Sequence, residues 1–381
     1  MNGVTTRLSA GETTAWECAD FVRTIAPASP LTPYAAVRAV NTSTVAMRTC
    51  TEWTRRIIST GGAQGCDQFE VPTGDPLCYL SSKMDPIPCA QASTDAGEAL
   101  IGTAPAGTVV WILLEHDGPW APKLLESAEL PGAAKNRLMA WEKAVPGSRL
   151  QLFRSDQPVR EPRLMIAVGR PIDPFIVEWR LPDYDELTQI DLEGPLSGVA
   201  SGSATIHRTP KHFVCTHGKR DACCAKWGVA VHREMAQLAP ESVFQTTHVG
   251  GHRFAANVVS LPHGICYGRI EPTDGKPLIE AHGRGEYFDL EKLRGRACYD
   301  EGAQVADKIV REEVTDMHLE ALELINSQLV DDQHRVRIAD RSQRLHDVAI
   351  QRRRTDRFRP ESCGKDPAPV FEMDVIAHAK L

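Results

Sequence analysis

The stretch Val214–Gly228, "VCTHGKRDACCAKWG", decides how the second half of this chain folds. It starts as an apolar strand, passes through a charged loop, and enters a helical pattern at its paired cysteines. Further along, "THVGGHRFAANV" (Thr247–Val258) places two histidines four positions apart around two glycines. Strand ends and loops bring thiols and imidazoles to one point more readily than the middle of a helix does, so these stretches predict a metal site.

The two cysteines that we expect as ligands flank the loop between strand and helix. Cys215 ends the strand and Cys224 starts the helix. The helix N-terminus, together with the loop cations Lys219 and Arg220, favours the thiolate form of a cysteine that lies there. Cys223 is adjacent to Cys224 and either thiol could face the metal, so at this level both remain candidates.

The two histidines that complete the set are His248 and His252. The glycines between them allow a tight turn that can bring both rings to one point. His217 lies in the first loop, where it either orients a ligand or meets solvent.

The spacing of these ligands bears on the identity of the metal. A structural zinc finger uses Cys-x2-4-Cys with His-x3-5-His; the histidine pair fits, but eight residues separate Cys215 from Cys224. A loop of that length suits a group larger than one ion. A two-iron, two-sulfur cluster spans more space and accepts both cysteine and histidine ligands.

Composition bounds the class of protein. The chain has 381 residues, 42% hydrophobic and 24% charged, which is typical of a multi-domain globular protein. A net charge of -7 argues against nonspecific nucleic-acid binding, and no apolar run is long enough to span a membrane. The N-terminal stretch shows no secretory signal pattern, so we expect a cytoplasmic protein whose 11 cysteines remain reduced.

Hydrophobic periodicity predicts two α/β layers in series. The first layer, 89–195, has strands in "TVVWILLEH", "RLQLFRSD" and "RLMIAVGR" and a helix in "PGAAKNRLMAWEKAVPG". A Gly/Ser-rich linker, Glu193–Ala204, leads to the second layer, 205–330, which includes a helix expected over Ala303–Gln328. Residues 331–381, with "VRIAD" and "VFEMDVIA", are expected to be strands that close on both layers.

Residues 1–88 form an extension of uncertain structure, with a helix expected only near Thr51–Ile58. Because regular patterns begin after Met84, one hypothesis is that translation starts there. The intact mass of the natively expressed protein tests it.

The motifs "FVCTHGKRDACCAKWG" and "HVGGHRFAANV" resemble the sucrase/ferredoxin-like family, a branch of the thioredoxin-like ferredoxins, and the similarity extends from about Cys89 to the C-terminus. The resemblance implies two thioredoxin-like α/β lobes, of which the C-terminal one is the ferredoxin domain. It also implies a 2Fe-2S cluster held by Cys215, Cys224, His248 and His252, with His217, Lys219, Arg220 and Cys223 around it.

The implied function is proton-coupled, one-electron transfer with an unknown redox protein partner, by a carrier that turns over no substrate of its own. One alternative is a structural zinc ion on the same four ligands, stabilising a binding module. Another is a cysteine-dependent thioredoxin-like oxidoreductase acting through Cys223 or Cys224, although no Cys-x-x-Cys pair is present. Cys266, Cys298 and Cys363 show no partner pattern, and we expect them to be buried small hydrophobic residues.

Overall fold

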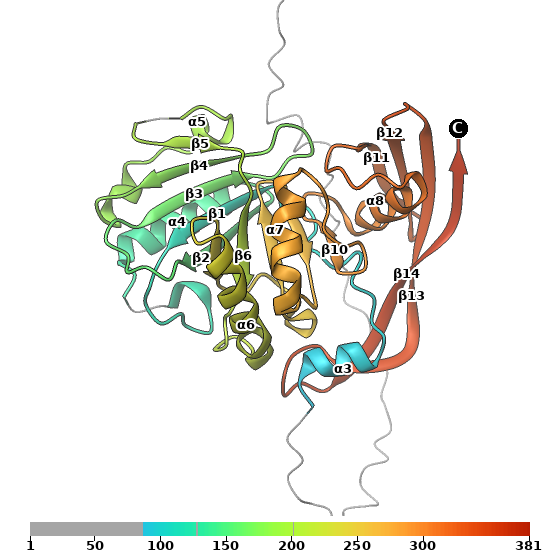
Figure 1. Cartoon of the computed structure of the whole chain (residues 1–381), viewed down its shortest axis with the longest axis horizontal. Coiled ribbons are helices and arrows are strands. Elements are labelled where there is room, and N and C mark those ends of the chain that lie inside the picture. The colour runs from blue at the N-terminus through green and yellow to red at the C-terminus, as the bar shows by residue number, and fades with distance from the viewer. Residues whose placement is uncertain (1–86, 127–128, 201) are drawn as a thin grey trace, which may run out of the picture. The chain divides into compact units, whose positions relative to one another are not determined.

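The computed structural model describes residues 87–126, 129–200 and 202–381 (Figure 1). The expected helix near Thr51–Ile58 and the alternative start at Met84 lie outside the described residues, as does nearly all of segment 1–88. Within the described part of the chain, no helix is long and apolar enough to cross a membrane.

The first half of the main sheet is built from the apolar runs expected as strands. β1 (Val110–Glu115) and β2 (Ser148–Arg154) are parallel, and α4 (Gly132–Ala144) connects them. β3 (Arg163–Val168) and β4 (Phe175–Arg180) add antiparallel strands, which gives the order β2-β1-β3-β4. Every residue of β1 and β3 is buried, as expected for continuous apolar strands at the centre of a sheet.

The second half repeats this arrangement. β6 (Lys211–Cys215) and β7 (Val243–Thr246) are parallel and are connected by α6 (Ala222–Leu238). β8 (Val258–Leu261) and β9 (Ile265–Tyr267) follow as antiparallel strands, so the order is β7-β6-β8-β9. The two sides of the sheet therefore have the same strand order.

The two halves form one curled mixed sheet of ten strands, because β2 and β7 pair antiparallel, with Phe153 opposite Thr246. β5 (Thr205–His207) and β10 (Leu293–Arg296) lie at its two edges. Apolar side chains bury this junction: the ring of Phe153 meets those of Phe213 and Phe244 at centroid distances of 5.6 and 5.3 Å. The halves therefore share a hydrophobic core as well as a sheet.

Two expected elements differ in the structure. The helix predicted over Ala303–Gln328 ends early: α8 spans Glu301–Val314, and Thr315 has a left-handed backbone with φ 56°. β11 (Leu322–Val330) replaces the rest, because an apolar pattern that fits a helix also suits a half-exposed strand. The linker predicted at Glu193–Ala204 includes a short helix, α5, whose bounds are Glu193–Leu196.

The C-terminal strands form a separate antiparallel sheet with the order β11-β12-β13-β14. "VRIAD" lies in β12 (Gln333–Asp340) and "VFEMDVIA" in β14 (Pro367–Lys380), which confirms both as strands. β13 (Leu345–Pro360) and β14 make a long hairpin whose turn lies beside α3 (Cys89–Asp95) (Figure 1). The remaining short helices are η3 (Leu124–Glu126), η4 (Asp185–Thr188), η5 (His252–Phe254), η6 (Pro272–Asp274) and α7 (Gly275–Gly283).

Candidate metal centre

The strand–loop–helix that carries the cysteines is tightly packed. Cys215 is the last residue of β6, and α6 begins beyond the loop with Asp221 as its N-cap, accepting the backbone N–H of Cys223 at 2.9 Å. Gly228 lies against the strand end: a Cβ there would stand 2.1 Å from the carbonyl oxygen of Cys215. This close approach brings the first turn of α6, with Cys224, next to the end of β6.

The "HVGGH" turn brings the histidines to the same place. Gly250 and Gly251 have φ of 91° and 69°, a conformation that L side chains disfavour, so the two glycines permit the turn. The Nδ1 atom of His248 lies 3.7 Å from the Sγ atom of Cys224. His252 opens η5, and its ring stacks on that of His248.

The donor atoms fit a metal. One atom each from Cys215, Cys224 and His248 lies within 4.8 Å of the others, and both thiols are buried. Nδ1 of His252 is buried and has no hydrogen-bond partner among the described residues. An unpaired polar atom inside a protein is costly, and a metal ion or cluster would satisfy it. The structure thus brings together Cys215, Cys224 and His248, and places the ring of His252 against that of His248.

Electrostatics favours the ligand forms of Cys215 and His252, while Cys224 keeps its proton as long as the neighbouring Cys215 is the thiolate. The thiol of Cys224 and the ring of His248 hydrogen-bond to Cys215 and hold the pKa of the Cys215 thiol well below its usual value. The Cys215 thiolate and burial raise the pKa of Cys224 in turn. Burial lowers the pKa of His252, so its ring is neutral near pH 7. A thiolate and a neutral imidazole are the forms that bind metals.

Several residues that the sequence did not single out hold the "HVGGH" turn in place. The Arg294 guanidinium, fully buried, donates to the carbonyl oxygen of Gly250 at 2.9 Å and to Oδ1 of Asn257 at 2.8 Å. Asn257 donates its side-chain N–H to the carbonyl of Gly251, also at 2.9 Å. Burial lowers the pKa of Arg294 to about 10, still high enough to keep it charged. No short motif signals these contacts, because they join residues from separate strands.

The predicted neighbours have distinct roles. Nδ1 of His217 accepts the backbone N–H of His248 at 3.3 Å, so this residue orients the turn. Lys219 and Arg220 are exposed, and Arg220 lines a cleft of about 590 Å³ together with Lys123, Arg149 and His248. His248 therefore lies between the buried thiols and an open surface.

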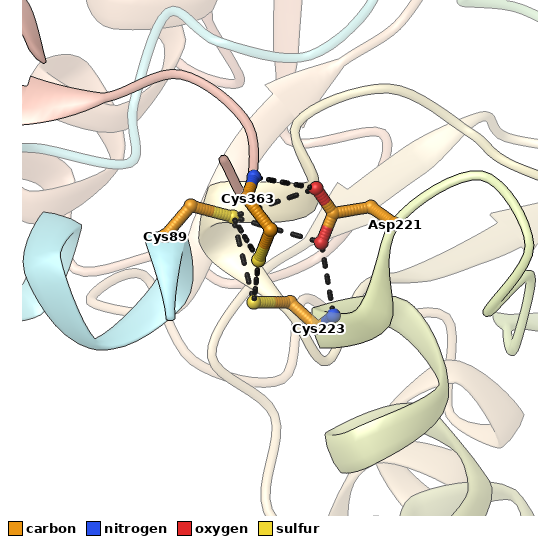
Figure 2. A group of neighbouring side chains, drawn as sticks. All are labelled: Cys89, Asp221, Cys223 and Cys363. Carbon is orange, nitrogen blue, oxygen red and sulfur yellow. Dashed lines mark hydrogen bonds between the residues drawn. The ribbon is translucent and has the colours of Figure 1, made fainter. Parts of the chain in front are cut away.

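Cys223 faces away from this group. It lies instead with Cys89 and Cys363, at Sγ–Sγ distances of 3.4 and 3.3 Å (Figure 2). The expectation that Cys363 is an isolated buried residue is therefore wrong: it is partly exposed and in contact with other thiols. The contact spans β13–β14 and α6, a pairing that sequence spacing alone does not show.

Comparison with known proteins gives a family match. The sucrase/ferredoxin-like family model matches residues 100–295. The protein named "Altered inheritance of mitochondria protein 32" from Meyerozyma guilliermondii is 33% identical over 93 residues, or 22% of this chain. The aligned part spans 33% of that relative's length, about one third of it. No solved structure matches the chain.

Proposed function

Since the chain belongs to the sucrase/ferredoxin-like family, whose model covers just over half of it, we propose that this protein is a one-electron carrier. In this proposal Cys215, Cys224, His248 and His252 hold a two-iron, two-sulfur cluster. The observation that carries it is the convergence of two buried thiols and the His248 imidazole, on which the ring of His252, with its unpaired Nδ1, is stacked.

The fold is compatible with this proposal. Each half of the main sheet has a parallel strand pair joined by a helix, followed by two antiparallel strands. That arrangement is the one expected of thioredoxin-like lobes, and the candidate site lies at a strand end in the second lobe. We therefore take the second half to be the thioredoxin-like ferredoxin domain.

Histidine ligation sets the expected chemistry. A bound cluster would supply reversible uptake of a single electron. Two thiolates and two neutral imidazoles make the site about two charges less negative than four thiolates would, so adding an electron costs less than in plant-type ferredoxins, whose potentials lie near about -400 mV. Each ligating ring also keeps a second nitrogen that binds a proton. We expect electron transfer to depend on pH.

The geometry supports a proton partner for one ring. Nε2 of His252 lies 3.9 Å from Oδ2 of Asp221, a distance that a small movement or one water would bridge. Although burial opposes ionisation, backbone N–H donors from Cys363 and Cys223 hold the pKa of Asp221 to about 2. A permanently charged carboxylate favours a proton on the facing nitrogen of His252.

The cleft at His248 supports an acidic redox partner. Its lining includes the cations Lys123, Arg149 and Arg220, against a single carboxylate, Glu142. Such a surface attracts an anionic protein or small reductant and places it near a candidate ligand. The partner in this proposal is therefore a redox protein with an acidic face.

A second candidate is a single zinc ion on the same residues. The observation that favours it is the 4.8 Å limit on the distances between the donor atoms of Cys215, Cys224 and His248, which also suits one ion. In that case the centre stabilises a binding module and carries no electrons.

The deciding experiment is a visible spectrum of anaerobically purified protein, followed by iron, sulfide and zinc analysis. Absorption bands that bleach with dithionite, together with about two irons per chain, support the carrier. These signals should be absent from Cys215→Ser and unchanged in Cys266→Ser, which alters a buried thiol outside the site. If the wild-type protein is colourless and contains zinc that Cys215→Ser loses, the electron-carrier proposal is wrong and the zinc-stabilised module is supported.

A further inference from the structure

A second group of potential ligands lies beside the first but shares no residue with it. Three thiols, Cys89, Cys223 and Cys363, lie together beside the carboxylate of Asp221 (Figure 2). They come from three separate elements: the start of α3, the start of α6, and the turn between β13 and β14. Cys89 and Cys223 are 134 residues apart, and Cys223 and Cys363 are 140 apart.

The distances match one tetrahedral ion. The three sulfur–sulfur distances are 3.4 Å (Cys89 to Cys223), 3.3 Å (Cys223 to Cys363) and 3.7 Å (Cys363 to Cys89). A tetrahedral ion with metal–sulfur bonds of about 2.3 Å separates its sulfurs by about 3.8 Å, so a small expansion admits the ion. Ligands on opposite irons of a two-iron cluster lie farther apart than these sulfurs do.

The carboxylate is positioned as the fourth ligand. Oδ2 of Asp221 accepts from the Ser362 hydroxyl and the Cys363 backbone N–H, each at 2.9 Å. Oδ1 accepts the Cys223 backbone N–H at 2.9 Å and the thiol of Cys89 at 3.7 Å. Once the Cys89 thiol gives up its proton to bind a metal, Oδ1 has a lone pair available on the side of the thiols.

We propose that Cys89, Cys223, Cys363 and Asp221 bind a structural zinc ion. Three soft thiolates and one carboxylate make a closed set of four donors that zinc accepts, and this set leaves no open position for a substrate. The ion would join α3 and the β13–β14 turn to the first turn of α6. Cys363, the partly exposed member, gives the ion a path from solvent.

The site would also support the candidate metal centre without sharing its ligands. Asp221 is the N-cap of α6, and Cys223 precedes Cys224. Zinc on these residues fixes the start of α6, and loss of zinc would loosen the turn that carries Cys224. The zinc proposal does not depend on the iron proposal, because the two groups are separate.

The test is metal analysis of the full-length chain by plasma mass spectrometry after expression with both iron and zinc available. We expect about one zinc per wild-type chain, falling at least fivefold in Cys89→Ser and in Cys363→Ser. Cys215→Ser should lose iron and keep zinc. Cys298→Ser, which changes a thiol outside both groups, should keep both metals.

A second measurement covers the case in which these variants fail to fold. Wild-type protein should release its zinc on titration with a mercurial thiol reagent, and its zinc X-ray absorption should show about three sulfurs at about 2.3 Å and one oxygen. Wild-type protein without zinc, zinc retained in both Cys89→Ser and Cys363→Ser, or zinc lost in Cys215→Ser alone would overturn the proposal. A disulfide between any two of the three cysteines in freshly prepared protein would also overturn it.

Discussion

The rings of His248 and His252 lie stacked, with their centroids 4.8 Å apart and their planes inclined by 29°. His248 lies in the loop after β7, and His252 is the first residue of η5. The two glycines between them make the stacking possible. The pair is therefore held as one unit, in which His248 contacts the buried thiol of Cys224 at 3.7 Å. Replacing either histidine tests whether the pair binds a cluster.

His248→Cys and His252→Cys each replace a neutral ligand by a thiolate, so each should lower the reduction potential by more than about 100 mV. The pH dependence of the potential should also become shallower, because one titrating ring is lost. Protein-film voltammetry between pH 6 and 9 measures both. His207→Gln, a histidine on β5, is the control and should behave as wild type. An unchanged pH dependence in both cysteine variants would count against histidine ligation.

Gly228→Ala should destabilise the protein by about 2 to 3 kcal/mol and reduce metal occupancy, because the new methyl group would lie 2.1 Å from the carbonyl oxygen of Cys215. Urea unfolding and metal analysis measure the two effects. Gly283→Ala in α7 is the matched control, since a Cβ there meets no atom within 4 Å. Equal stability of the two variants would contradict the close packing of α6 on β6.

Charge reversal in the cleft should slow reaction with anions. In Lys123→Glu/Arg220→Glu, oxidation of the reduced protein by ferricyanide should be about tenfold slower at low ionic strength, and the difference should vanish in high salt. Stopped-flow absorbance measures the rates. Lys226→Glu, an exposed cation that does not line the cleft, is the control. The same slowing with a cationic oxidant would show that the site itself was damaged.

Stability should fall between pH 6.5 and 4 because of a buried histidine. His212 lies on β6, bonds Ser260 at 2.9 Å and meets the ring of His282 edge-on. Burial lowers the pKa of His212 from 6.5 to about 4. Between these two pH values the His212 ring is protonated in the unfolded chain and neutral in the folded chain. The stabilisation is complete above pH 6.5 and is lost as the pH falls, by about 3 kcal/mol at pH 4.

Urea unfolding at several pH values tests this expectation. His212→Gln cannot titrate, so its unfolding free energy should fall less steeply below pH 6.5 than that of the wild type. The difference between the two proteins removes the effects shared by both, such as the titration of His282. Parallel pH profiles would show that the pKa of His212 is the same in the folded and unfolded chains.

Local sequence patterns predicted much of the main sheet. Continuous apolar runs such as the one around Ile112 have few alternatives to a buried strand, and all of β1 is buried. The strand–loop–helix from Cys215 to Cys224 was also readable, because the apolar strand, the charged loop and the start of the helical pattern all lie within a short segment. The same local reasoning failed after Thr315, where one apolar pattern fits both a helix and a strand.

By itself, then, the sequence determined the α/β elements and the chemistry of two short loops, since both depend on neighbours a few positions apart. Only the tertiary structure decided that β2 pairs with β7 to join the halves, that Arg294 holds the "HVGGH" turn, and that Cys89 and Cys363 meet Cys223. Such contacts depend on how whole elements pack, and no local periodicity records a pairing between residues that lie in separate elements far apart in the chain.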